Sequence, residues 1–411
     1  MRKGWQKLQL AGLVKIKHGF AFGSEFFAAS GPYVLLTPGN FIEEGGFRWM
    51  GQKQKFFNGP VDPNYVLDEG DLLIAMTEQA PGLLGSSFFV PESGRYLHNQ
   101  RLGKAVVARR DLLDKEFLHH WLNRSRVRQE IFSEASGTKV KHTSPDKLRS
   151  LEINLPPLPE QRRIAEILRT WDEAIEKLEA LLTANIRRRV WLRTHLFTGK
   201  VRLPGFKGEW RWVPLSDVLH EHGLNSTGSE EVFSVSVHKG LVNQVEHLGR
   251  SFSAANTDNY NRVLPGDIVY TKSPTGDFPL GIIKQSKINS EVIVSPLYGV
   301  FTPQTYALGV ILDALFESPV AARNYLRPLV QKGAKNTIAV TNRQFLEGKL
   351  HLPMEPAEQA AIADIVKTSN AELAAIESEI TALQRQKRGL MQKLLTGEWR
   401  VSVDQPAKAA Q

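Results

Sequence analysis

A stretch of about forty residues occurs twice in this chain, and this repeat limits the folds that the chain can adopt. Residues 160–199 recur at 358–397, without a gap, at an offset of 198 positions. The matching positions are identical or conservatively changed. In the first copy they are Glu160, Gln161, Ile164, Ala165, Ile167, Ile175, Leu178, Leu182, Leu192, Leu196 and Gly199. Their counterparts in the second copy are Glu358, Gln359, Ile362, Ala363, Ile365, Leu373, Ile376, Ile380, Leu390, Leu394 and Gly397. Such a repeat indicates one structural unit used twice.

Each copy is predicted to form one long helix. Its apolar residues recur every three or four positions, which gathers them on one stripe of a helix. About 38 residues span roughly 57 Å, which is longer than a globular core needs. Prolines precede each copy and a glycine follows it, as at helix ends: Pro156, Pro157, Pro159 and Gly199; Pro353, Pro356 and Gly397. We therefore expect the copies to pair as a coiled coil, since two unrelated amphipathic helices would not share one register.

The segments before the two helices also share a frame. Short apolar runs between Gly, Pro and Asn clusters predict strands of a mixed sheet or barrel in both. Gly70-Asp71 precedes one such run, and Gly266-Asp267 precedes its counterpart. Gly137-Thr138-Lys139 likewise matches Gly333-Ala334-Lys335, whereas the loops between these elements differ in length and sequence. A helix is expected at about 114–132.

The predicted fold class is therefore α+β, with two similar mixed α/β domains joined by two long helices in an antiparallel coiled coil with pseudo-two-fold symmetry. The predicted bounds are 1–155 for the first domain, 156–200 for the first helix, 201–352 for the second domain, 353–400 for the second helix and 401–411 for a disordered tail.

Composition narrows the classes of function. The chain has no cysteine, which excludes disulfides, thiolate zinc sites and a cysteine nucleophile, and fits a cytoplasmic protein. No apolar run is long enough for a membrane span. The formal net charge is +9, of which residues 1–159 contribute +5. A basic balance favours a polyanion, and nucleic acid before membrane because no cationic amphipathic anchor is visible.

The common catalytic motifs are absent from the sequence. It contains no Walker loop, HExxH, GxSxG or dinucleotide glycine fingerprint, and its 11 histidines lack metal-ligand spacing. Asp62-Pro63-Asn64-Tyr65 differs from the motif of amino-methyltransferases at its third position, and Glu347-Gly348-Lys349 lacks a nuclease partner; we interpret both as surface turns or loops. We expect no catalytic residue, no metal and no cofactor in this chain.

Basic and polar side chains beside aromatics or in matching loops are candidates for DNA contacts. The candidates are Lys17, Arg48, Lys53, Lys55, Thr77, Arg101, Lys139, Lys141, Lys272, Lys335 and Arg343. For any one of them, a solvated surface residue is the simpler interpretation.

The chain resembles the DNA specificity subunits of type I restriction-modification systems over essentially its whole length. The resemblance is strongest where Leu155-Pro156-Pro157-Leu158-Pro159-Glu160-Gln161 enters the first helix and where Phe197-Thr198-Gly199-Lys200 ends it. His98-Asn99-Gln100-Arg101 also fits the family. The second helix departs from the pattern, with Met354-Glu355-Pro356-Ala357 at its entry and Ser369 in place of Trp171.

This resemblance implies two target recognition domains, each reading one half of a split, asymmetric sequence in double-stranded DNA. It also implies that the helices fix the spacing and dock two methyltransferase subunits, which bring S-adenosylmethionine, and that restriction subunits can join. The helix positions expected to serve are Ile164, Ile167, Trp171, Ile175, Leu178, Leu182, Ile362, Ile365, Leu373, Ile376 and Ile380. Two alternatives are a coiled-coil scaffold that binds proteins and not DNA, and a fused single-chain methyltransferase, which the lack of an FxGxG loop disfavours.

Overall fold

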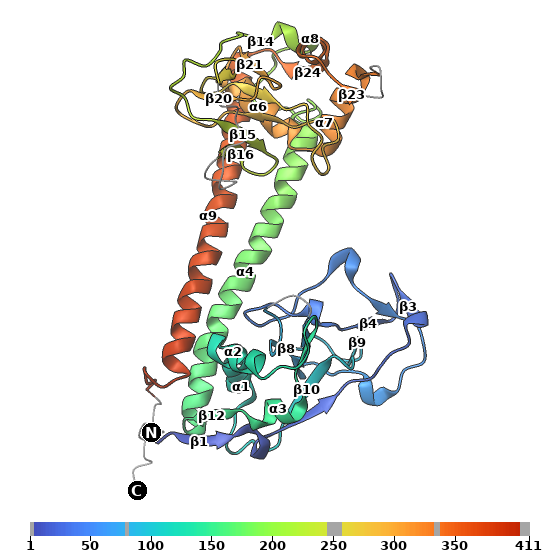
Figure 1. The fold of residues 1–411 in the computed structure, drawn as a ribbon, viewed down its shortest axis with the longest axis vertical. Helices are drawn as coiled ribbons and strands as arrows, with labels where there is room; N and C mark the ends of the chain where they lie inside the picture. The colour runs from blue at the N-terminus through green and yellow to red at the C-terminus, as the bar shows by residue number, and fades with distance from the viewer. Residues whose placement is uncertain (1–3, 79–81, 245–256, 333–337, 403–411) are drawn as a thin grey trace. The chain divides into compact units, whose positions relative to one another are not determined.

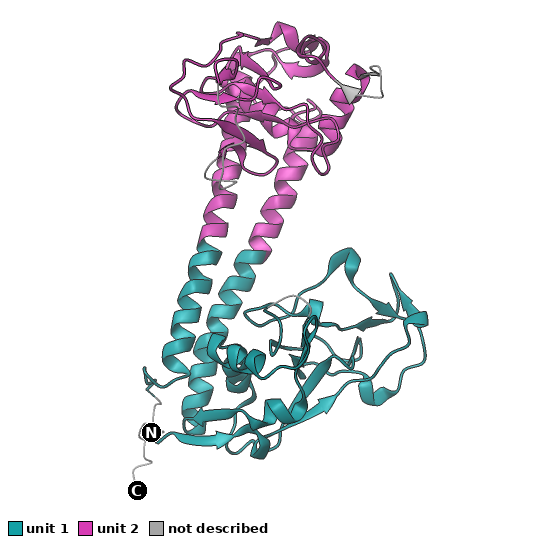
Figure 2. Ribbon diagram, in the orientation of Figure 1, with its two compact units in different colours: residues 1–179, 379–411 teal, residues 180–378 magenta. Residues whose placement is uncertain are grey.

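The computed structural model describes residues 4–78, 82–244, 257–332 and 338–402. The chain forms two compact units (Figure 2): unit 1 comprises residues 1–179 and 379–411, and unit 2 comprises residues 180–378. Both long helices are divided between the units, so the predicted domain bounds stay predictions. The expected tail lies largely outside the described residues.

Two helices of 39 residues each dominate the secondary structure (Figure 1). They are α4 (Leu158–Leu196) and α9 (Pro356–Leu394), and both their first and last residues are 198 positions apart. Gly199 and Gly397 follow with φ of 69° and 66°, a conformation that favours glycine and ends a helix. No helix among the described residues has an apolar stretch long enough to cross a bilayer.

Unit 1 contains a mixed α/β domain. One antiparallel sheet has the order β2-β10-β6-β8, formed by Val14–His18, Leu102–Val107, Leu72–Ala75 and Ser87–Phe89. A second sheet has the order β3-β5-β4-β9, formed by Phe27–Ala28, Phe56–Phe57, Tyr33–Leu35 and Tyr96–Leu97. Two strand pairs complete it, β1 (Gln6–Gln9) with β12 (Glu152–Leu155) and β7 (Thr77–Glu78) with β11 (Lys141–His142).

The helices of this domain connect it to α4 and α9. They are α1 (Lys115–Leu122), α2 (Ser125–Ser133) and α3 (Pro145–Ser150), so the predicted helix at 114–132 is two helices. One apolar core joins these helices to Leu168 from the first half of α4 and to Met391 from the last part of α9. Within unit 1, the beginning of α4 therefore packs with the end of α9 and with the domain.

Unit 2 repeats this plan. Its main sheet has the order β14-β21-β18-β19, formed by Leu219–His220, Gly299–Pro303, Ile268–Tyr270 and Ile283–Gln285. The strand pairs are β13 (Trp210–Pro214) with β24 (Lys349–Pro353), β15 (Phe233–Ser236) with β16 (Gly240–Asn243), β17 (Asn261–Val263) with β20 (Val292–Val294), and β22 (Gln331–Lys332) with β23 (Ile338–Ala339). The helices are α6 (Tyr306–Phe316), α7 (Pro319–Leu326) and α8 (Asn342–Glu347).

The glycines that the two domains share have a structural reason. Gly70 and Gly266 stand before β6 and β18, with φ of 75° and 90°. A side chain there would strain the turn, which explains why glycine recurs before the same central strand. The structure thus has the mixed α/β character that the sequence predicts.

Candidate functional site

A buried glutamine fastens α4 to the domain of unit 1. Gln161 is fully buried. Its Oε1 accepts from the Asp114 backbone N–H at 2.9 Å, and its Nε2 donates to the Leu112 and Pro156 carbonyls at 2.7 and 2.8 Å. Asp114 is the N-cap of α1. One side chain thus holds the start of α4 against the start of α1.

Gln359 makes the equivalent joint in unit 2. Its Oε1 accepts from the Thr305 hydroxyl at 2.6 Å, and its Nε2 donates to the Pro353 carbonyl at 2.8 Å. Thr305 is the N-cap of α6. The two glutamines are 198 positions apart, and each bonds to the cap of the domain helix beside it.

Each glutamine is preceded by a buried glutamate that forms an ion pair with an arginine. Glu160, 3% exposed, accepts two hydrogen bonds from Arg400 at 2.6 and 2.9 Å. Glu358, 1% exposed, accepts two from Arg202, both at 2.7 Å. Arg400 and Arg202 are also 198 positions apart. Such bidentate pairs fix geometry as well as charge.

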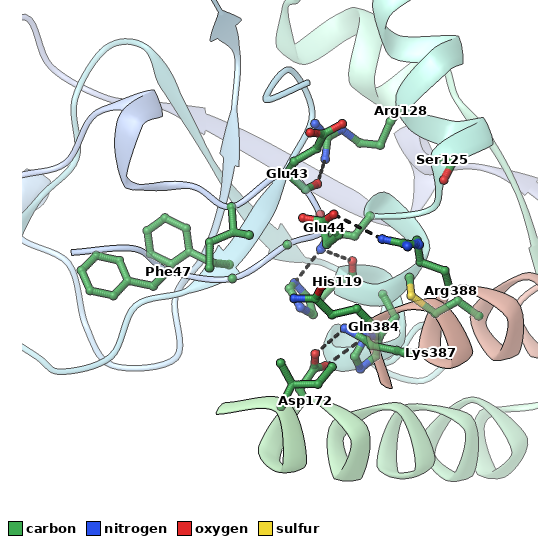
Figure 3. Close-up of a pocket in the computed structure, with 18 of the residues that line it drawn as sticks. Glu43, Glu44, Phe47, His119, Ser125, Arg128, Asp172, Gln384, Lys387 and Arg388 are labelled. Atoms are coloured by element: carbon green, nitrogen blue, oxygen red, sulfur yellow. Dashed lines mark hydrogen bonds and ion pairs between the residues drawn. The ribbon is translucent and has the colours of Figure 1, made fainter. Parts of the chain in front are cut away.

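A polar cluster lies between α1, α4 and α9 of unit 1 (Figure 3). The buried Lys387 of α9 forms an ion pair with Asp172 of α4, and His120 of α1 lies 3.9 Å from the same carboxylate. Burial lowers the pKa of His120 well below its usual value, and lowers that of His119 to about 3. Both imidazoles are therefore neutral at pH 7. His119 Nδ1 lies 3.0 Å from the Ser87 hydroxyl.

The corresponding positions of unit 2 are built differently. Arg189, the counterpart of Lys387, forms its ion pair with Glu317 at the end of α6. Asn370 replaces Asp172, and its Oδ1 has no hydrogen-bond partner among the described residues. Counted from the N-caps, Val310 and Ile311 stand where α1 has its two histidines, and both are buried.

A cavity of about 1070 Å³ opens beside the polar cluster of unit 1. Phe47 and Arg128 line it from the domain, and Gln384 and Arg388 line it from α9 (Figure 3). Arg388 reaches Glu44 at 3.4 Å, and the Arg128 guanidinium donates to the Leu84, Glu43 and Gly82 carbonyls. Among the described residues, no group of three or more His, Asp or Glu could hold a metal ion.

Comparison with known proteins finds a family model that matches less than half of the chain. Residues 2–185 match the family model described as type I restriction modification DNA specificity domain. This part of the chain is therefore similar to the DNA specificity domains of type I restriction-modification systems. The EcoBI specificity subunit of Escherichia coli is 27% identical over 179 residues, 43% of this chain and 34% of that protein. The match therefore spans about a third of that relative.

Solved structures show the same fold over nearly the whole chain. The S subunit of the type I restriction-modification system from M. genitalium has a TM-score of 0.58 and 16% identity, covering 95% of this chain and 96% of that one. A chain described under complex assembly and conformational transition of the type I R-M system has a TM-score of 0.53 and 16% identity, covering 97% and 99%. At these identities the likeness concerns the fold alone.

Some of the predicted DNA contacts lie close together in unit 1. Strand pairing sets Lys141 beside Glu78 and His142 beside Thr77. Met76, next to Thr77, donates its backbone N–H to the Arg101 carbonyl at 3.0 Å. Lys139 and Arg101 are exposed, whereas the Lys141 ammonium lies 5.4 Å from the centre of the Phe132 ring. This basic group forms where β6, β7 and β11 meet.

The other predicted contacts of unit 1 are separate from that group or already bonded. Arg48 donates from its guanidinium to the Gly39 carbonyl at 3.2 and 2.9 Å. Lys55 lies over the Phe27 ring at 5.4 Å, and Lys53 is exposed nearby in the chain. Lys17 is exposed on β2, opposite Lys104.

The predicted contacts of unit 2 are fewer. Burial lowers the pKa of Lys272, which is half-buried, while the carboxylate of Glu221 acts in the opposite direction. Arg343 is exposed and pairs with Glu347 at 3.0 Å. Lys335 lies outside the described residues.

The helix positions predicted to bind partners are mostly covered within this chain. Ile164 and Ile362 are fully buried, and Leu373 and Ile380 are buried as well. The remaining positions are half-buried: Ile167, Trp171, Ile175, Leu178, Leu182, Ile365 and Ile376. Their binding of a partner stays a prediction.

Sequence reasoning missed a set of apolar residues that α4 exposes. Leu181, Ile186, Val190 and Trp191 are 48%, 47%, 47% and 51% exposed. The repeat carried a signal for them, because their counterparts 198 positions later are Glu379, Gln384, Arg388 and Gly389. Apolar residues that only one copy carries do not belong to the shared helix stripe.

Proposed function

We propose that this chain is the DNA specificity subunit of a type I restriction-modification complex. The observation that carries the proposal is the duplicated joint. Gln161 and Gln359 fasten two long helices to two domains whose main sheets have corresponding strand orders, and Glu160 and Glu358 each pair with an arginine that follows the other long helix. A duplicated frame with different loops suits the reading of two different half-sites, because loops on a rigid scaffold are where binding specificity varies.

In this proposal, residues 1–155 and 201–352 are target recognition domains, and each reads one half of a split, asymmetric site in double-stranded DNA. Residues 156–200 and 353–400 are spacer helices that pair as an antiparallel coiled coil with pseudo-two-fold symmetry. The ion pairs between Lys387 and Asp172 and between Arg188 and Glu372 support the pairing of the helices within each unit. A rigid pair of helices would fix the distance between half-sites.

The chain itself would perform no chemistry. Two methyltransferase subunits would dock on it and bring S-adenosylmethionine, and restriction subunits would join for cleavage, all in the cytoplasm. The family match and the net charge of +9 support binding to DNA. Contacts between basic side chains and DNA phosphates supply salt-dependent affinity, and contacts with base edges supply sequence specificity.

The deciding experiment is genome-wide mapping of adenine methylation in cells that express this chain with and without its cognate methyltransferase subunit. We expect one split, asymmetric motif, present only with both proteins. Methylation by this chain alone would mean that it carries an active site. No new motif, despite a stable complex, would favour the alternative of a protein-binding scaffold.

DNA binding can be tested separately at the basic group of unit 1. Replacing Lys139 and Lys141 by alanine in the assembled complex should weaken DNA binding. The slope of the logarithm of the association constant against the logarithm of the salt concentration should fall by about one to two, as expected for the loss of one or two phosphate contacts. Lys7→Ala is a matched control, because Lys7 pairs with Glu152 on a different strand pair. An unchanged salt slope would assign both lysines to the solvated surface.

A further inference from the structure

An exposed tryptophan lies in a basic segment of unit 1. Trp49 is 45% exposed, and the segment of residues 45–57 that carries it contains no acidic residue. The cations of this segment are Arg48, Lys53 and Lys55. Aromatic rings among cations suit nucleic acid, because phosphates attract the cations and bases stack on the rings.

Two buried amides hold the backbone on both sides of Trp49. Asn40 is fully buried and Gln54 is 4% exposed. The Asn40 carbonyl accepts from the Arg48 N–H at 2.8 Å, and Asn40 Nδ2 donates to the Arg48 carbonyl at 3.2 Å. Gln54 Oε1 accepts from Asn40 Nδ2 at 2.8 Å and from the Met50 N–H at 3.3 Å. The residues before and after Trp49 are thus both fixed, although the indole lies at the surface.

The indole ring itself also has fixed neighbours. The Arg95 guanidinium lies 5.8 Å from the centre of the Trp49 ring, and the Phe56 ring meets it edge-on, with centroids 6.0 Å apart. A side chain held in this way loses little freedom when it binds a partner. The position of Trp49 is therefore set before any ligand arrives.

The two lysines of the segment are available for phosphates. Lys53 and Lys55 are exposed, and neither ammonium forms an ion pair among the described residues. The Lys55 ammonium lies 5.4 Å from the centre of the Phe27 ring, which is compatible with a second contact to an anion. Arg48 has a different role, because its guanidinium already donates to the Gly39 carbonyl.

Unit 2 has no such arrangement among its described residues. Its exposed aromatic side chains there are Trp191, Trp212 and Tyr306, which lie on α4, on β13 and at the start of α6. None of them stands in a basic loop. The family model described as a DNA specificity domain covers residues 2–185, which include the segment around Trp49.

We infer that Trp49 stacks on DNA in the first half-site and contributes to its recognition, while Lys53 and Lys55 contact phosphates beside it. This inference rests on the proposed function. A base in a duplex offers its face only where a base step opens, and pyrimidine–purine steps open most readily. The indole should therefore favour a half-site that has such a step where Trp49 meets the DNA.

The test uses the chain assembled with its methyltransferase subunit and a duplex that carries the motif found by methylation mapping. Trp49→Ala should weaken DNA binding roughly ten- to one-hundred-fold. The slope of its salt dependence should not change, because a stacking contact releases no counterion. Lys53→Ala should instead lower this slope by about one. Trp49→Phe, which keeps a ring, should retain most of the affinity.

A control variant and a change in the DNA sharpen the test. Trp212→Ala removes a tryptophan that is 70% exposed on β13 of unit 2, and it should leave DNA binding unchanged. Trp49→Ala should melt within a few degrees of wild type, because the side chain is nearly half exposed. Replacing the pyrimidine–purine step of the first half-site by a purine–purine step should weaken binding by wild type more than binding by Trp49→Ala.

Three outcomes would overturn the inference. They are unchanged DNA binding by Trp49→Ala, weaker binding with a smaller salt slope, and loss of the methyltransferase subunit from the Trp49→Ala complex. In each case the proposed function would stand, because wild type would still bind the motif. No binding of the motif by the wild-type complex would overturn both.

Discussion

The two units fasten their helices alike but fill the space beside the joint differently. In both units a buried glutamine is hydrogen-bonded to the N-cap residue of a domain helix, and a buried glutamate forms an ion pair with an arginine. Beside these, unit 1 buries His119, His120 and Lys387, whereas unit 2 has Val310, Ile311 and Arg189, of which the two aliphatic residues are buried. The comparison shows that the same hydrogen bonds and ion pairs attach the long helices in both units, while the residues around them differ.

The largest expected difference between the units is their response to acid. Burial lowers the pKa of His98 to about 4 and of His119 to about 3, and that of His120 lies well below its usual value. In an unfolded chain a histidine has a pKa of about 6.5 and binds a proton below it. Stability from these groups is therefore complete above pH 6.5 and is lost as the pH falls towards their folded values.

At pH 5 this loss amounts to about 2 kcal/mol each for His98 and His119, by linkage, and the lowered pKa of His120 acts in the same direction. Hydrogen exchange of segments in each unit, measured between pH 7 and pH 5 with correction for intrinsic rates, should show unit 1 opening first, because the described histidines of unit 2 are exposed or half-buried. His120→Ile, which introduces the side chain that Ile311 has in unit 2, should remove part of the acid sensitivity. Equal loss of protection in both units would contradict this explanation.

The shared joint should respond alike in both units. Gln161→Leu leaves the Asp114 N–H and the Leu112 and Pro156 carbonyls without their partner, a cost of roughly 3 kcal/mol. Gln359→Leu removes two hydrogen bonds and should cost about 2 kcal/mol. Hydrogen exchange measured at increasing denaturant concentration would give the stability of each unit separately, and hence the cost of each substitution. A loss of stability in only one of the two units would contradict the prediction that the two joints are equivalent.

The polar cluster predicts a smaller and one-sided effect. Asp172→Ala leaves the buried Lys387 without its carboxylate, and since Asp172 is 41% exposed we expect a loss of about 2 kcal/mol in unit 1. Asn370→Ala, at the counterpart position, should change the stability of unit 2 by less than about 0.5 kcal/mol. Lys387→Met in the Asp172→Ala background should restore most of the loss, which separates the buried charge from a packing defect.

The smallest effect concerns the ion pair across the mouth of the cavity. Arg388 and Glu44 are both about half exposed and 3.4 Å apart, so Arg388→Ala should cost no more than about 0.5 kcal/mol. The same change should widen the fluctuations of residues 43–46, measurable as faster exchange of their amides. Unchanged exchange there would show that the Arg128 hydrogen bonds alone hold this loop.

The repeat allowed much of the fold to be predicted from the sequence. An offset of 198 positions located both long helices to within a few residues, because prolines and glycines mark their ends. The matching glycines before β6 and β18 followed from the same comparison. The break between α1 and α2 was missed, because Asn123 and Arg124 do not interrupt the apolar pattern that predicts a helix.

Side-chain partners could not be predicted in this way. Arg400 pairs with Glu160 although they are 240 positions apart, and only the folded chain brings them together. Arg48 looked free beside an aromatic residue, but its guanidinium bonds a carbonyl of its own loop. The roles of the candidate DNA contacts therefore stay predictions, and the exposed Trp191 became visible only when burial was known.

The division of the chain into units has a consequence for its synthesis on the ribosome. Unit 2 is one continuous segment, residues 180–378, whereas unit 1 needs residues 379–402 to complete a core that begins with the first domain. At a translation rate of about 5–20 residues per second, Met391 and Leu394 are added roughly 10–40 s after the first domain has been synthesised. The domain that is made first is thus the last to be finished, and its uncovered apolar surface is where chaperones would bind the nascent chain.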